Sequence, residues 1–235
     1  MRKLLFFAVG SIFLAGCYPT LPPVLGEGTE VLRPGGVSLT AAGAGAAFGA
    51  NVTQCCAAAS ATEVGGGLEA RLRAGIGAKQ EIGASVFLGI GNPYGNGDPP
   101  FAAGGAISYK VAPLQWLAVV ADAGALDFAA ASVGIVSGDL AVIAAPYTAA
   151  NGTQLYTAVK GAIAVPFLSG SRDLIESVTV PIGLSVPTSK RVRFLVEAGP
   201  IFGFAQQVDD SAPDMPLDAT SIGAYAAVAF TFVLR

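Results

Sequence analysis

The sequence contains no histidine, and charged residues are scarce. They make up 12% of the 235 residues, against roughly a quarter in an ordinary soluble domain. Without histidine the chain cannot form the Ser-His or Cys-His pairs on which many hydrolases depend. We therefore expect a protein that is not an enzyme, with no catalytic residues and no metal site.

Basic residues are also few, which bears on nucleic acid binding. The chain has 13 Lys and Arg residues against 16 Asp and Glu residues, a formal net charge of -3, and no long basic run. A nucleic-acid-binding surface needs clustered positive charge, so we expect no nucleic acid partner. The hydrophobic share of 53% excludes a disordered chain.

Beyond its first sixteen residues the chain lacks a run of about 18 apolar residues, the length that a membrane-spanning helix needs. Its hydrophobic residues occur instead in short alternating patches rich in Ala, Gly and Val. This combination predicts a β protein that lies in a membrane or is attached to one.

The N-terminus has the parts of an export signal. Arg2 and Lys3 precede an apolar stretch that ends in small residues before Cys17. We expect residues 1–16 to be removed as a signal peptide. Residues 17–35 hold four prolines among small and polar residues, a composition that stays extended, so we expect a tether that leads to a β domain.

The residues Leu14-Ala15-Gly16-Cys17 resemble the lipobox of bacterial lipoproteins. The resemblance implies a lipoprotein signal peptide and a diacylglyceryl thioether on Cys17, with no cofactor besides this covalent lipid. Tyr18 replaces the Asp that holds members of this family in the inner membrane, which implies sorting to the outer membrane. An ordinary secretory signal with an incidental cysteine is the alternative.

Apolar residues alternate with other residues along most of the chain. Every second residue of Leu68–Ile76 is apolar, and Glu69, Arg71 and Arg73 lie between them; a similar stretch follows at 82–90 after a short turn. A period of two places alternate side chains on opposite faces of a strand. A helix would need apolar spacings of three and four residues, and the Gly and Pro content would destabilise it.

The same pattern predicts ten strands, at 36–49, 64–77, 81–91, 102–111, 115–125, 134–147, 154–167, 176–187, 190–204 and 221–234. Four short turns alternate with five longer connections rich in Gly, Pro, Asn and Asp, at 50–63, 92–101, 126–133, 168–175 and 205–220. Transmembrane β-barrels show this asymmetry, with short periplasmic turns and longer outer loops. An even strand number places both ends of the chain at the short-turn end.

Residues 36–235 resemble bacterial outer-membrane β-barrel proteins, through GLEARLRAGIGAKQEIGASVFLGIG, its counterpart VPIGLSVPTSKRVRFLVEAGP, and the last strand SIGAYAAVAFTFVLR. In that strand Phe230, Phe232 and Leu234 keep the alternation of the family, but Arg235 follows where the family ends in an aromatic residue. The resemblance implies an all-β, antiparallel, up-and-down transmembrane β-barrel of about ten strands, within about 8 to 12. It also implies the outer-membrane insertion machinery as a partner, a bacterial outer-membrane location, and periplasmic N- and C-termini.

A spanning sheet must close into a barrel, because lipid cannot satisfy open strand edges. Charges on the alternating strands should then face the lumen, since a basic residue on the lipid side costs about 2–4 kcal/mol at the midplane. The expected lumen network consists of Glu69, Arg71, Arg73, Glu81, Lys110, Asp122, Asp139, Lys160, Arg193 and Glu197. We expect these charges to pair and to plug a narrow barrel. A polar conduit, or a pocket lined by Arg71, Arg73 and Arg193, is the alternative.

Cys55 and Cys56 are adjacent in the first of the long connections. Adjacent Cα atoms stand about 3.8 Å apart, below the usual disulfide range, although an oxidising compartment makes free thiols uncommon. A strained vicinal disulfide, a bridge to another chain, a redox role and an incidental structural role all remain open. Two thiolates alone make a poor metal site.

These observations favour an outer-membrane β-barrel lipoprotein that is a structural or surface-interaction component, with a narrow channel as a variant of that role. Membrane lipid is its expected partner, and the sequence identifies no protein partner. The alternative is a soluble, periplasm-facing β-barrel lipoprotein that binds an apolar ligand. A soluble barrel keeps apolar side chains inside and charges outside, so the orientation of the side chains separates the two.

Overall fold

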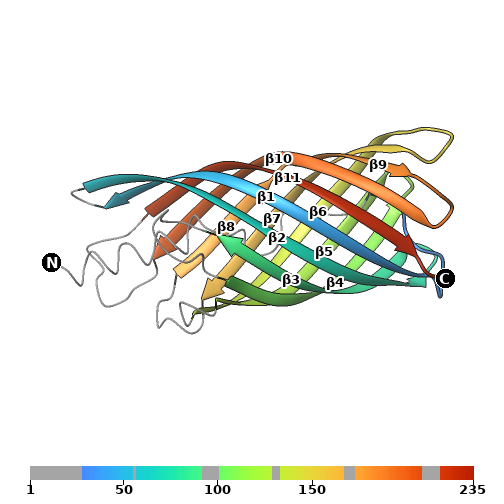
Figure 1. Cartoon of the computed structure of the whole chain (residues 1–235), viewed down its shortest axis with the longest axis horizontal. Helices are drawn as coiled ribbons and strands as arrows, with labels where there is room; N and C mark the ends of the chain where they lie inside the picture. The colour runs from blue at the N-terminus through green and yellow to red at the C-terminus, as the bar shows by residue number, and fades with distance from the viewer. Residues whose placement is uncertain (1–27, 55–56, 92–100, 129–132, 167–172, 208–217) are drawn as a thin grey trace.

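The computed structural model describes residues 28–54, 57–91, 101–128, 133–166, 173–207 and 218–235, and these residues form a tilted, closed antiparallel barrel (Figure 1). The strands are β1 (Val37–Gln54), β2 (Ala57–Gly77), β3 (Gln80–Gly91), β4 (Phe101–Leu114), β5 (Leu117–Phe128), β6 (Val133–Thr148), β7 (Gln154–Pro166), β8 (Asp173–Thr179), β9 (Ile182–Pro187), β10 (Val192–Gln207) and β11 (Asp218–Val233). Strand β11 pairs with β1 over its whole length and so closes the sheet.

The strands make ten positions around the wall, because β8 and β9 are two parts of one. Strand β7 pairs with β9 over residues 154–157 and with β8 over 160–164. Between them lie Val180 and Pro181, and a proline cannot donate to a sheet. The amide of Ala158 donates to the carbonyl of Pro181 (3.1 Å), and that of Val180 to the carbonyl of Pro200 (3.2 Å). The ten-strand antiparallel barrel is therefore confirmed, with one interrupted strand.

The expected long connection at 50–63 is wrong, because β1 and β2 continue through it. Their antiparallel register runs from Gly49 opposite Thr62 to Gln54 opposite Ala57. The residues here are mostly Ala, Ser and Thr, which are small enough for either face and so show no alternation. The last long connection is also shorter than expected, since β10 reaches Gln207 and β11 begins at Asp218.

Large apolar side chains point outward from the barrel. Leu68, Val86 and Ile107 have 65%, 62% and 68% of their surface exposed, and similar residues lie on the outer face of each strand except β5. The exposed residues of β5 are Ala121, Ala123, Ala125 and, near the long-loop end, Asp127. The outer face is thus the apolar one, as the alternation predicts.

The interior is filled by side chains rather than open. One buried apolar cluster includes Val120, Ile143, Tyr156, Leu195 and Tyr225. A second, near the long-loop end, consists of Phe87, Ala102, Leu126, Ile135, Ala164 and Ile175. No helix long and apolar enough to cross a membrane occurs among the described residues.

Gly183 lies opposite Tyr156 across the β7–β9 pair, and a Cβ atom at Gly183 would overlap the ring of Tyr156. We expect Gly183→Ala to lower the free energy of unfolding by about 1–3 kcal/mol, as overpacking does in a filled interior. The measurement is the urea midpoint of the folded band on an unboiled gel. Gly161→Ala is the control, because a Cβ there meets nothing within 4 Å. Equal midpoints for both variants would contradict the expectation.

Candidate functional site

The lumen holds a band of charged side chains at the short-turn half of the barrel. Glu69, Arg71 and Arg73 occupy alternate positions on β2, so all three point inward, and each is 7–8% exposed. Glu81 on β3 and Lys110 on β4 are 1% and 2% exposed and lie opposite each other in register. The charges of the alternating strands are therefore enclosed by the wall.

Acids and bases of this band form ion pairs. Arg71 Nε lies 2.9 Å from Glu69 Oε1, and Lys160 Nζ lies 3.1 Å from Asp139 Oδ2. Arg73 Nη1 lies 3.6 Å from Glu81 Oε2. Pairing of this kind offsets part of the cost of removing the charges from water.

Asp122 is half-buried and stands directly opposite Asp139 in the β5–β6 register. Two carboxylates at a cross-strand pair repel each other. The Lys160 ammonium, on the far side of Asp139, supplies the opposite charge at this point of the wall.

Glu197 accepts hydrogen bonds from two tyrosines that were not among the expected site residues. The hydroxyl of Tyr156 donates to Glu197 Oε2 (2.8 Å), and the hydroxyl of Tyr225 donates to Oε1 (3.2 Å). Both tyrosines are buried. The alternation of the sequence does place both tyrosines in the lumen. Tyr156 lies an even number of residues from the inward Lys160, and Tyr225 lies an even number of residues from the inward Thr231.

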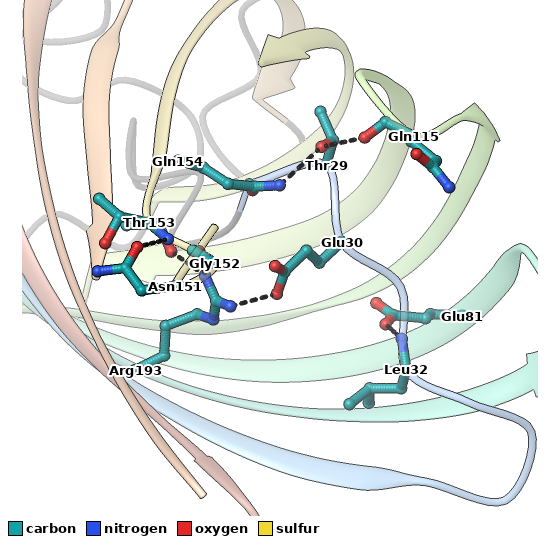
Figure 2. A network of polar contacts seen from close by, with 12 residues as sticks. Thr29, Glu30, Leu32, Glu81, Gln115, Asn151, Gly152, Thr153, Gln154 and Arg193 are labelled. Carbon is teal, nitrogen blue, oxygen red and sulfur yellow. Dashed lines mark hydrogen bonds and ion pairs between the residues drawn. The ribbon is translucent and has the colours of Figure 1, made fainter. Parts of the chain in front are cut away.

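Residues 28–36, here called the strap, cross the mouth of the barrel at the short-turn end (Figure 2). At the β2 side, the amide of Gly35 donates to the carbonyl of Gly75 (2.8 Å). At the other side, Thr29 Oγ1 donates to the carbonyl of Gln115 (2.8 Å), in the turn between β4 and β5. Thr29 is 1% exposed, so this part of the expected tether packs against the barrel.

Three charges of the expected network bind the strap. Lys110 Nζ donates to the carbonyls of Gly28 (2.8 Å) and Glu30 (2.7 Å), and the amide of Leu32 donates to Glu81 Oε1. Arg193 Nη2 lies 2.6 Å from Glu30 Oε2. The strap therefore takes up polar groups of the wall that would otherwise face an open mouth.

Arg193 is less buried than Arg71 and Arg73, with 22% of its side chain exposed against 10% and 9%. It also donates to Ser185 Oγ (2.8 Å) and to the carbonyl of Gly152 (3.2 Å). Its acid is Glu30 of the strap, whereas Arg71 and Arg73 pair with acids of β2 and β3. Each of the three arginines thus has a carboxylate within ion-pair distance.

Cys17, Cys55 and Cys56 lie outside the described residues, as do residues 1–16. Within the described ranges, no group of three or more Cys, Asp and Glu residues is arranged to hold a metal ion.

No protein-family model matches the chain, and no curated protein matches it. Solved structures similar to it include the translocator domain of the autotransporter NalP from Neisseria meningitidis, at 9% identity over 87% of this chain and 90% of that one, with a TM-score of 0.45. OprG, an outer membrane protein from Pseudomonas aeruginosa, is 12% identical over 86% and 98%, with a TM-score of 0.36. The P. putida toluene transporter TodX is 8% identical over 94% and 96%, with a TM-score of 0.33. At these identities and scores, the activities of these barrels do not carry over to this chain.

The Lys160–Asp139 pair tests whether the lumen charges hold the barrel together. We expect Lys160→Met to lower the free energy of unfolding by about 3–5 kcal/mol, because it leaves the buried Asp139 uncompensated. The double variant Lys160→Met/Asp139→Leu should recover much of that loss. Urea titration of the gel shift on boiling measures both. A single variant as stable as the wild type would contradict a structural role for the pair.

Proposed function

We propose that this protein is an outer-membrane β-barrel lipoprotein without enzymatic activity, whose barrel crosses the membrane and whose lumen is closed. One observation carries the proposal: apolar side chains cover the outside of the barrel, and ionic ones are enclosed. Ile107 is 68% exposed while Glu81 is 1% exposed. In water this arrangement would be unfavourable on both faces, and in a bilayer it is favourable on both.

Aromatic residues near the two ends of the barrel support the same placement. Trp116 and Tyr147, near the short-turn end, are 54% and 60% exposed, and Phe101 and Phe204, near the long-loop end, are each 46% exposed. Aromatic belts of this kind lie at membrane interfaces. The alternative, a soluble barrel with an apolar ligand inside, requires the opposite orientation of the side chains.

The position of the strap supports a lipid anchor at the short-turn end. The strap, the start of β1 and the C-terminal residue Arg235 lie together there, since the amide of Val37 donates to the carbonyl of Arg235 (3.2 Å). From Cys17 to Gly28 the chain reaches at most about 35–40 Å at about 3.3–3.6 Å per residue. A diacylglyceryl group on Cys17 can therefore insert in the leaflet at this end, which is the periplasmic end in the proposed orientation.

The filled lumen favours a structural or surface-interaction role over an open channel. Ion pairs and apolar clusters occupy the interior, and the strap covers the mouth. Within this proposal, a narrow channel requires that the strap leave the mouth.

Cysteine labelling tests the membrane placement. In a Cys55→Ser/Cys56→Ser background, Leu72→Cys and Val86→Cys should resist a water-soluble thiol reagent in intact outer membranes, because both side chains point outward from the wall and are 50% and 62% exposed. Ala150→Cys, in the exposed turn between β6 and β7, is the control and should be labelled readily once the outer membrane is permeabilised. Equal labelling of all three would contradict insertion. The folded barrel should also stay with outer membranes after a carbonate wash.

Planar-bilayer recording tests the closure of the mouth. Lys110→Met removes two hydrogen bonds from a charged donor to the strap, each worth about 1.5–3 kcal/mol, so we expect it to raise conductance above that of a silent wild type. Lys79→Met is the matched control, because Lys79 at the same end donates to the carbonyl of Pro113 and not to the strap. Glu30→Gln, which alters the strap but not the wall, should raise conductance less, since a partly exposed ion pair is weak. Silence of Lys110→Met in a barrel that still shifts on boiling would contradict closure by the strap.

A further inference from the structure

Exposed cations gather on one part of the rim at the short-turn end. Arg33 of the strap, Lys79 of the β2–β3 turn, Lys190 and Arg191 of the β9–β10 turn, and the C-terminal Arg235 are all exposed. We call these five residues the cationic arc. None of them belongs to the enclosed lumen network.

The arc is continuous around the wall. Strands β10, β11, β1 and β2 are successive neighbours in the sheet. The amide of Val233 donates to the carbonyl of Arg191 (2.7 Å), and the amide of Val37 to that of Arg235 (3.2 Å), so the β9–β10 turn, the end of β11 and the start of β1 meet. The arc thus covers one side of the rim.

The rest of the described rim is neutral. The turn between β4 and β5 carries Gln115 and Trp116, and residues 149–153 between β6 and β7 are Ala, Asn, Gly and Thr. Among the described residues of this end, Glu30 is the one exposed carboxylate side chain, and Arg193 already pairs with it at 2.6 Å. No described acidic side chain besides Glu30 is therefore exposed beside the arc, although the whole chain has a net charge of -3.

Apolar outward side chains lie directly beside the arc. Ile76 precedes the β2–β3 turn, and Phe232 and Leu234 precede Arg235; they are 51%, 39% and 57% exposed. If these residues contact acyl chains, the arc is level with the phosphates of the same leaflet. Long basic side chains can then lay their aliphatic stems along the apolar belt and extend their charges to the headgroups.

We propose that the cationic arc binds the headgroups of anionic phospholipids in the leaflet at the short-turn end. The inference rests on the proposed membrane placement. It goes further by naming the class of lipid that is bound and the side of the barrel that binds it. A lipid is favoured over a free anion because the arc is spread along the rim beside an apolar surface, and a lipid meets both the charge and the apolar residues.

Quenching of tryptophan fluorescence by brominated lipids can compare the lipids beside the arc with those on the neutral side of the barrel. The chain has one tryptophan, Trp116, but it lies close to Lys79 of the arc, which donates to the carbonyl of Pro113. The reference is therefore the double variant Trp116→Phe/Tyr147→Trp, whose fluorophore replaces an exposed side chain of β6 on the neutral side. The double variant Trp116→Phe/Leu234→Trp places the fluorophore beside the arc. Each protein is folded into phosphatidylcholine vesicles that contain a minor share of brominated phosphatidylglycerol or the same share of brominated phosphatidylcholine.

We expect the Leu234→Trp fluorophore to be quenched at least about twofold more by the anionic lipid than by the neutral one, since each basic residue near a surface attracts anionic lipid. The Tyr147→Trp fluorophore should be quenched equally by both. Adding Lys190→Gln/Arg191→Gln should reduce the excess, because two of the five cations are lost, whereas Asp127→Asn/Glu176→Gln, which removes two exposed charges at the opposite end, should leave it unchanged. Sodium chloride should reduce the excess by screening.

The contrary outcomes separate the two proposals. Equal quenching by both lipids beside the arc overturns the headgroup inference and leaves the spanning barrel intact. Loss of the excess in inorganic phosphate, but not in sodium chloride of equal ionic strength, identifies a site for free phosphate and also overturns it. No quenching at either position means that the barrel is not inserted, which overturns the proposed function together with the inference.

Discussion

The constraint on which the structure depends is closure of a sheet whose two faces need opposite environments. Strand β11 pairs with β1 from Ser38 opposite Val233 to Thr53 opposite Asp218, so that no edge strand remains among the described strands. Closure fixes the parity of every strand, because a shift by one residue would exchange its two faces. Leu68 and Glu69 are neighbours in the chain, yet closure gives one the outer surface and the other the lumen.

The enclosed face shows how a narrow barrel accommodates charges. Acids and bases on adjacent strands compensate one another, tyrosine hydroxyls hold Glu197, and apolar residues fill the remaining space. The strap completes this interior at one end, where Lys110 and Glu81 meet its backbone. The charged side chains of the lumen are thus paired with one another or with the strap, whereas one side of the rim carries exposed cations.

Much of the wall was predictable, because alternation of apolar and charged residues depends only on strand geometry. It indicated the inward charges of β2 and the number of strand positions. It failed at 50–63, because small residues suit either face of a strand. It also failed at Val180–Pro181, because a proline that keeps the alternation does not show that the strand is interrupted there. The strap could not be predicted, since Lys110 binds its backbone carbonyls, and carbonyls leave no signature in the sequence. Cys17, Cys55 and Cys56 lie outside the described ranges, so their roles stay predictions from the sequence.

The attachment of the strap has a consequence for assembly. Its partners are contributed by Gly75, Glu81, Lys110, Gln115 and Arg193, which all follow it in the chain by dozens of residues. The full set of these contacts can form only after strands from both halves of the polypeptide stand in the wall. The strap comes first in the described chain, yet it is therefore among the last segments to complete its contacts, after the strands that carry its partners have assembled.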